Sequence, residues 1–109
     1  MTKESWYTTN QMKLFAIKVP PSMVQKITAG ADAKSTSRRA FYRSILVDFL
    51  PVADKVSYLA SYKNTDAKTL RFWMDRDIYD CIEDLSRKHN VSLTSVCYTA
   101  LYNHFEKAR

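Results

Sequence analysis

The chain has 109 residues, enough for one domain with a modest core but few for an enzyme with a deep cleft. Lys and Arg outnumber Asp and Glu by 17 to 11. The resulting net charge of +6 favours a polyanionic partner, because binding to phosphates releases counterions. No apolar run approaches the roughly 18 residues of a membrane span, and the start, MTKESWYTTNQM, lacks the apolar stretch of a signal peptide, so we expect a cytoplasmic protein with no membrane partner.

The composition favours helices and argues against metal or cofactor sites. One Gly and three Pro indicate helices joined by short turns. Cys81 and Cys97 lie 16 residues apart, with no CxxC motif and no nearby pair of histidines. We therefore expect no zinc site, no disulfide framework and no cofactor.

A strand is predicted at 13–19, KLFAIKV, after an N-terminal tail of residues 1–12. Apolar side chains alternate along it with the period of two that is typical of a half-buried strand. The predicted buried face consists of Phe15, Ile17 and Val19, and the predicted outer face of Leu14, Ala16 and Lys18.

Two helices are predicted after this strand. The first begins at Pro20 or Pro21, because proline is tolerated in a first turn, where the missing N–H would have no partner. The second has Ser37 as its N-cap and ends at Pro51. Its inward residues are predicted to be Phe41, Ile45, Leu46 and Phe49.

A connector is predicted at 51–68, PVADKVSYLASYKNTDAK, before the chain enters a second set of elements. A short extra helix through Val56 and Leu59 is expected within it.

The same order of elements is predicted for residues 69–109. A strand comes first, with Leu70, Phe72 and Met74 on the buried face and Thr69, Arg71 and Trp73 on the outer face. A helix follows from about Asp75 to Lys88, Asn90 suits its C-terminal cap, and Ser92 suits the N-cap of the last helix. The inward face of that last helix is predicted to be Val96, Ala100, Leu101 and Phe105.

A shift of 55 residues places the first half on the second without a gap. Apolar positions meet apolar positions, and one helix-capping serine meets the other. We interpret this as an internal duplication. Each copy has one strand whose edges need a partner, so the two strands are expected to pair antiparallel and the helices to cover their apolar face. The matching positions are Phe15 and Leu70, Ile17 and Phe72, Val19 and Met74, Met23 and Ile78, Ile27 and Ile82, Ser37 and Ser92, Phe41 and Val96, and Leu46 and Leu101.

The pattern of strand, helix, turn capped by Ser, and helix resembles the ribbon-helix-helix DNA-binding proteins of the Arc, MetJ and CopG type. Those repressors are dimers with one copy per chain, whereas two copies in one chain are similar to the TraY class of relaxosome proteins from conjugative plasmids. The resemblance covers 13–50 and 69–109 as the two copies. It implies a mainly α fold with a two-stranded antiparallel β-ribbon, arranged as a tandem pseudo-dimer.

The resemblance also implies two kinds of DNA contact. The ribbon enters the major groove and its outer side chains read base edges, while the N-terminus of each second helix holds a phosphate. Trp73 departs from the family, which usually has a shorter polar side chain there. The implied base-reading residues are Leu14, Ala16, Lys18, Thr69, Arg71 and Trp73. The implied phosphate-binding residues are Ser37, Arg38, Arg39 and Arg43 in the first copy and Ser92, Leu93 and Thr94 in the second.

Two roles are expected for such a DNA-binding protein, and they share one surface. The first is a transcriptional regulator, with the transcription machinery as partner. The second is an accessory protein that binds an origin of transfer in plasmid conjugation and helps to place a relaxase. The expected state is a monomeric pseudo-dimer; association of neighbouring molecules on DNA and pairing of strands between chains stay open.

Three other interpretations of the sequence differ from DNA binding. An antitoxin-like protein-interaction module fits the fold, and an ordinary hairpin edge of an α+β domain fits the alternation but not the duplication. An enzyme is not predicted, because the seven tyrosines lack the His, Arg and metal clusters that would activate one. A helical acidic set is interpreted as a solvated face open to a protein partner, with no metal site: Asp75, Asp77, Asp80, Glu83 and Asp84.

Overall fold

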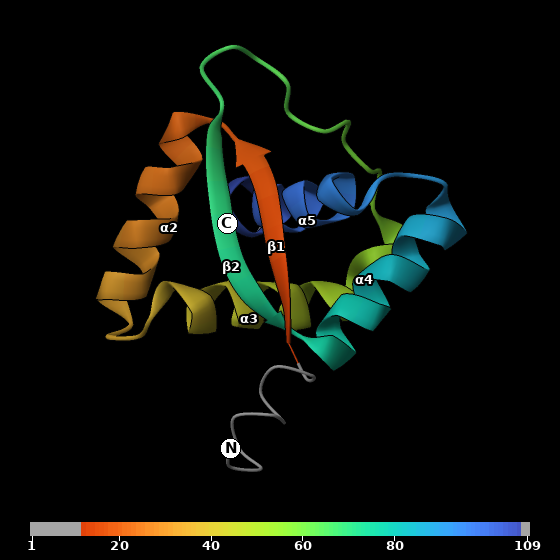
Figure 1. Ribbon diagram of the computed structural model, residues 1–109, viewed down its shortest axis with the longest axis horizontal. Helices are drawn as coiled ribbons and strands as arrows, with labels where there is room; N and C mark the ends of the chain where they lie inside the picture. Colours follow the sequence, from red (N-terminus) through yellow and green to blue (C-terminus); the bar gives the residue numbers. More distant parts are fainter. Residues whose placement is uncertain (1–11, 108–109) are drawn as a thin grey trace.

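The computed structural model describes residues 12–107, and the predicted tail, apart from Met12, lies outside the described residues. The fold is mostly helical with a two-stranded antiparallel sheet, as the sequence predicts (Figure 1). The elements are β1 (Met12–Val19), α2 (Pro21–Ala33), α3 (Arg38–Phe49), the 3-10 helix η1 (Leu50–Lys55), β2 (Lys68–Asp75), α4 (Arg76–His89), α5 (Leu93–Tyr102) and the π-helical turn η2 (Asn103–Lys107).

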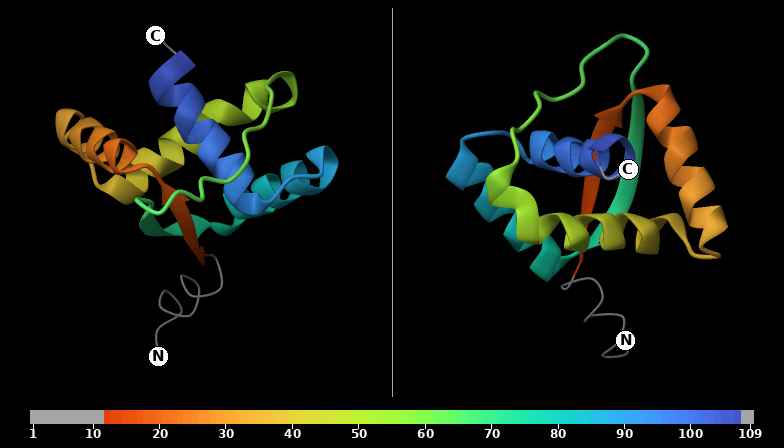
Figure 2. Two further views of the ribbon diagram at one scale, coloured as in Figure 1. Left: turned by 90° about the horizontal axis from the view of Figure 1, so that it is seen from above. Right: turned by 180° about the vertical axis from the view of Figure 1, so that it is seen from behind.

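The two strands form a ribbon with one buried and one exposed face. β1 pairs antiparallel with β2, and Phe15 lies opposite Phe72 while Ile17 lies opposite Leu70. These four side chains are buried, and the residues between them are exposed. The helices gather on the buried side, which leaves the other face of the ribbon uncovered (Figure 2).

The helix ends follow the local chemistry of the sequence. Pro20 is the N-cap residue of α2, with Pro21 as its first residue. Ser37 Oγ accepts a hydrogen bond from the N–H of Ala40, and Ser92 caps α5 in the same way. Asn90 ends α4 in the left-handed conformation, with φ of 55°. These predicted boundaries are confirmed because each depends on one or two neighbouring residues.

The helices of each half reach across to the strand of the other half. α3 contacts β2, α5 contacts β1, and α3 and α5 contact each other beneath the ribbon. The core therefore draws its apolar side chains from every strand and α-helix. Neither half could bury its own strand alone, so the two halves are expected to fold as one unit.

Close packing of α2 on α3 explains the only glycine. Gly30 lies in the last part of α2, and a Cβ atom there would clash with the ring of Phe41 on α3. A helix-interior glycine is unfavourable by about 1 kcal/mol relative to alanine. The close approach of the Phe41 ring accounts for its presence.

The connector differs from the prediction. The short helix is η1, which lies at 50–55, while Val56 and Leu59 are not helical. Leu59 instead uses its backbone to bind α5: its N–H donates to Thr99 Oγ1 at 2.9 Å, and its carbonyl accepts from Ser95 Oγ. Because these two backbone groups form hydrogen bonds with side chains of α5, they are satisfied without helical hydrogen bonds. Pro51 lies in the first turn of η1, and α3 ends two residues before it at Phe49, as expected.

None of the helices within residues 12–107 is long and apolar enough to cross a membrane.

Candidate nucleic-acid interface

The uncovered face of the ribbon presents all six side chains that the sequence predicts there. Leu14 and Trp73 are the most exposed large apolar residues of the described chain, at 56% and 52%. No acidic residue lies among the six. In the antiparallel register they form three directly opposed pairs: Leu14 with Trp73, Ala16 with Arg71, and Lys18 with Thr69.

The chemistry of this face changes along its length. One end is apolar, at Leu14 and Trp73, and the other is polar, at Lys18 and Thr69. Arg71 occupies the middle, opposite the small side chain of Ala16, and forms no ion pair with any residue within 12–107. Directly opposed Cβ atoms in such ribbons lie about 5 Å apart, so each pair offers two adjacent contacts to a ligand.

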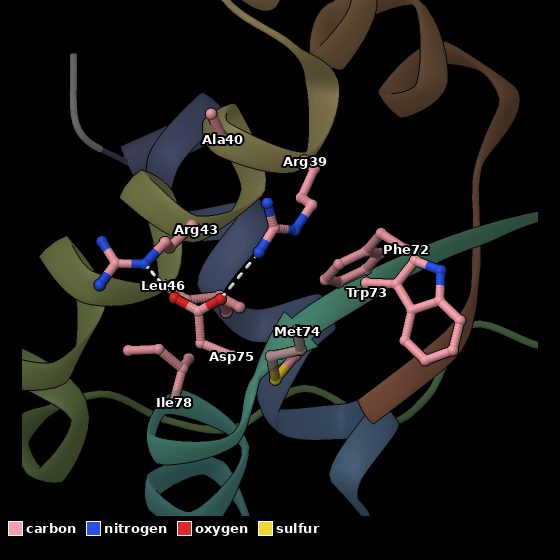
Figure 3. A pocket seen from close by; sticks show the side chains of 9 residues that line it. All are labelled: Arg39, Ala40, Arg43, Leu46, Phe72, Trp73, Met74, Asp75 and Ile78. Atoms are coloured by element: carbon pink, nitrogen blue, oxygen red, sulfur yellow. Dashed lines mark hydrogen bonds and ion pairs between the residues drawn. The ribbon is translucent and has the colours of Figure 1, made fainter. Parts of the chain in front are cut away.

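Arginines cluster at the start of α3, beside the apolar end of the ribbon. Arg39 Nη2 lies 3.0 Å from Asp75 Oδ1, and Arg43 Nε lies 2.5 Å from Asp75 Oδ2 (Figure 3). The hydrogen bond that Arg43 donates to Asp75, and then the negative charge of that carboxylate, raise the pKa of Arg43. Both arginine side chains remain about half exposed. Arg38 has no ion pair with any described residue and is exposed.

This arrangement corrects one prediction about the acidic set. Asp75 is not part of a solvated acidic face, because it ends β2 and pairs with Arg39 and Arg43 of α3. Only the three-dimensional structure brings it there, since its partners are 32 and 36 residues away in the chain. On α4, Asp80, Glu83 and Asp84 pair with arginines of the same helix. No group of metal-binding side chains occurs within residues 12–107.

A small pocket of about 80 Å³ lies beside these arginines. Figure 3 shows Arg39 and Arg43 from α3 converging on Asp75, with Trp73 on the same strand, β2. Its floor is apolar, from Leu46, Phe72, Met74 and Ile78.

The start of α5 lies at the other end of the ribbon and carries hydroxyl groups in place of arginines. Ser61 Oγ of the connector lies 3.0 Å from Ser92 Oγ and 2.7 Å from Thr94 Oγ1. Leu93 is partly buried against the core, so its backbone N–H is the group it can offer to an anion. Ser61 was missed by sequence reasoning, because the connector has no periodic pattern that would place it.

A cleft of about 710 Å³ separates this part of the connector from the ribbon. It joins predicted site residues from both strands and α5 with connector residues that the sequence did not single out. Its lining consists of Ala16, Ile17, Lys18, Ser61, Tyr62, Lys63, Thr69, Ser92 and Thr94.

Comparisons of this chain with protein-family models, curated proteins and solved structures found no match.

Proposed function

We propose that this protein is a tandem ribbon-helix-helix pseudo-dimer that binds double-stranded DNA with sequence preference and acts as a transcriptional regulator. The observation that carries the proposal is the uncovered ribbon face, which has six exposed side chains, none of them acidic, and a second-helix N-terminus at each end. A two-stranded β-ribbon fits the major groove, which is about 12 Å wide.

The strand register supports the duplication. Ala16 pairs with Arg71, the residue that the 55-residue shift assigns to it. The flanking pairs then exchange with each other under the same shift, since Phe15 opposite Phe72 becomes Leu70 opposite Ile17. Two copies related by a local two-fold axis would pair equivalent residues at the centre of the ribbon, as this register does.

The crossing of helices between halves supports a pseudo-dimer within one chain. Since α3 contacts β2 and α5 contacts β1, the second helix of each half covers the strand of the other. One chain therefore supplies both halves of a reader that would otherwise need two subunits.

The outer side chains have the chemistry for reading base edges. Arg71 and Lys18 can donate to guanine O6 and N7, Thr69 can bond to several bases, and the aliphatic side chains can contact a thymine methyl group. Trp73, opposite Leu14, adds a broad apolar surface at one end only. Because the two copies differ at every outer position, we expect a target without a palindrome.

Phosphate contacts at both ends would fix the ribbon in the groove. At α3 the groups are Ser37, Arg38, Arg39 and Arg43, and at α5 they are Ser92, Thr94 and the backbone N–H of Leu93. Helix N-termini favour anions through their unpaired N–H groups and the helix dipole.

Salt dependence tests this proposal against a protein-interaction module. If six or more phosphates are contacted, affinity for duplex DNA should fall by about three orders of magnitude or more between about 50 and 200 mM salt. Fluorescence anisotropy of a labelled duplex measures this. A flat response, or no binding at low salt, would contradict the proposed function and direct attention to protein partners.

One observation keeps the relaxosome role as a second candidate: two copies in a single chain are similar to the TraY class. The DNA-binding surface is the same for both roles. A preferred sequence found at a promoter supports regulation, whereas one found at an origin of transfer supports the accessory role.

A further inference from the structure

The two ends of the ribbon differ in how they carry positive charge. The 55-residue shift places Arg38, Arg39 and Arg43 on Leu93, Thr94 and Tyr98. The start of α5 therefore lacks the three cations that the start of α3 has. A binding surface that contacts phosphates on both sides of the groove would be unbalanced by this difference.

The connector brings a lysine to the end that lacks arginines. Lys63 lines the same cleft as Lys18 of β1 and Thr94 of α5. It is exposed, and it has no ion-pair partner within residues 12–107. None of the residues that line the cleft is acidic. The lining thus offers two ammonium groups and five hydroxyl groups, with no carboxylate among them.

The connector is fixed in this position by hydrogen bonds to α5. Leu59 is held at both its N–H and its carbonyl by Thr99 and Ser95. Ser61 is held by the hydroxyl groups of Ser92 and Thr94. These bonds lie within four residues of Lys63, so its backbone is placed beside the ribbon by the fold.

Charge at the α3 end is partly offset within the protein. Asp75 pairs with both Arg39 and Arg43, so three arginines and one carboxylate leave a local charge of +2. Lys18 and Lys63 give the cleft the same +2. Among these named side chains, Lys63 makes the charge of the two ends equal, and without it the α5 end has half as much. Asp66, which accepts a hydrogen bond from Tyr62, is not among the residues that line the cleft.

We propose that the connector is a DNA-contacting element and that Lys63, together with Lys18, binds a backbone phosphate at the α5 end of the ribbon. Lys63 thereby does in the second half what the α3 arginines do in the first. This inference rests on the proposed function, and it adds a contact that no strand or helix of the duplicated pattern contains.

The test compares three single substitutions by salt-dependent DNA affinity and by hydroxyl-radical footprinting. Lys63→Ala removes the proposed contact, Arg38→Ala removes a cation at the other end, and Lys26→Ala is the matched control. Lys26 pairs with Glu106, and η2 lies on the side of the molecule away from the ribbon's uncovered face (Figure 2). All three variants lose one positive charge, and circular dichroism and thermal unfolding check that each is folded.

We expect Lys63→Ala to reduce the slope of log affinity against log salt by about one unit, as expected for one lost phosphate contact. Its footprint should lose protection at one flank of the site, and Arg38→Ala should lose it at the opposite flank. A fourth variant, Lys63→Arg, retains the positive charge and should keep both the slope and the protection, and Lys26→Ala should resemble the unchanged protein.

The outcomes separate the two proposals. If the unchanged protein shows no salt-dependent binding to duplex DNA, the proposed function fails. If it binds and Arg38→Ala behaves as expected, but Lys63→Ala keeps the full slope and footprint, the connector contact alone is overturned. Equal effects of Lys63→Ala and Lys26→Ala would also overturn it, because net charge would then explain both.

Discussion

Ala16 and Arg71 lie directly opposite each other at the middle of the exposed ribbon face. The small side chain of Ala16 leaves the space beside the guanidinium group open. Arg71 also forms no ion pair with the residues described. Under the proposed function, Arg71 is therefore the side chain on this face that we expect to make a bidentate contact with guanine.

Arg71→Ala should relax base preference while leaving general DNA affinity nearly unchanged. We expect a loss of about 1 to 3 kcal/mol at the preferred site. Titration of the preferred and a scrambled duplex with each protein measures both. Lys26→Ala, which also removes one positive charge but lies away from the exposed ribbon face, serves as a control. Equal losses on the two duplexes would rule out a base-reading role for Arg71.

Asp75→Asn should strengthen binding to DNA of any sequence. The substitution removes the carboxylate that holds Arg39 and Arg43, so both guanidinium groups become available for phosphates. We expect the salt slope to steepen by about one unit.

Asp80→Asn makes the same change of net charge on α4, where Asp80 pairs with Arg76. This control should leave the salt slope nearly unchanged. Weaker binding by the Asp75 variant would contradict the prediction and would mean that Asp75 positions the arginines for DNA.

Gly30→Ala should destabilise the fold although alanine is the better helix former. Added volume in a packed core costs about 1 to 3 kcal/mol, and the new Cβ would clash with the Phe41 ring. Urea unfolding measures the loss. Ala29→Gly, at the exposed neighbouring position, isolates the helix-propensity term of about 1 kcal/mol. A rise in stability for Gly30→Ala would show that the ring moves aside freely.

His104 should make stability depend on pH in mildly acidic solution. Burial, and second the charge of Lys34, lower its pKa below the ordinary value of 6.5. Between the two pKa values the unfolded chain binds more protons, so the free energy of unfolding rises with pH there. The contribution is complete above about pH 6.5 and is lost as the pH falls toward the folded pKa.

Urea unfolding midpoints of the unchanged protein and His104→Gln, measured from about pH 7.5 to about pH 5, test this. The substituted protein should show a shallower pH dependence. Parallel curves would contradict the prediction. His89 and then Lys88 lower the pKa of Asp54, so this carboxylate changes the free energy of unfolding only below pH 3.8, outside the range measured.

The predictable parts of the molecule depend on neighbours in the chain. The period of two around Phe15 and Phe72 places the buried face of the ribbon, and Ser37 and Ser92 place the second helices. Each of these signals acts over a few residues, so it can be found without knowing the fold.

The unpredicted parts depend on contacts between distant segments. Asp75 binds two arginines of α3 that lie 32 and 36 residues away in the sequence, and Ser61 binds Thr94, which lies 33 residues away. The connector helix lies at 50–55 and not through Leu59 for the same reason, because the side chains that bind Leu59 come from α5. Such pairings follow from tertiary packing, which overrides local propensity.

Selection of bound fragments from random duplex DNA at about 0.15 M salt, followed by sequencing, tests the central claim most directly. We expect a short enriched motif that is asymmetric about its centre, and we expect Arg71→Ala to lose the base preference at that centre. A perfectly palindromic motif would contradict the claim that one chain, with two different halves, binds the site. Failure to retain or enrich any DNA would contradict DNA binding itself.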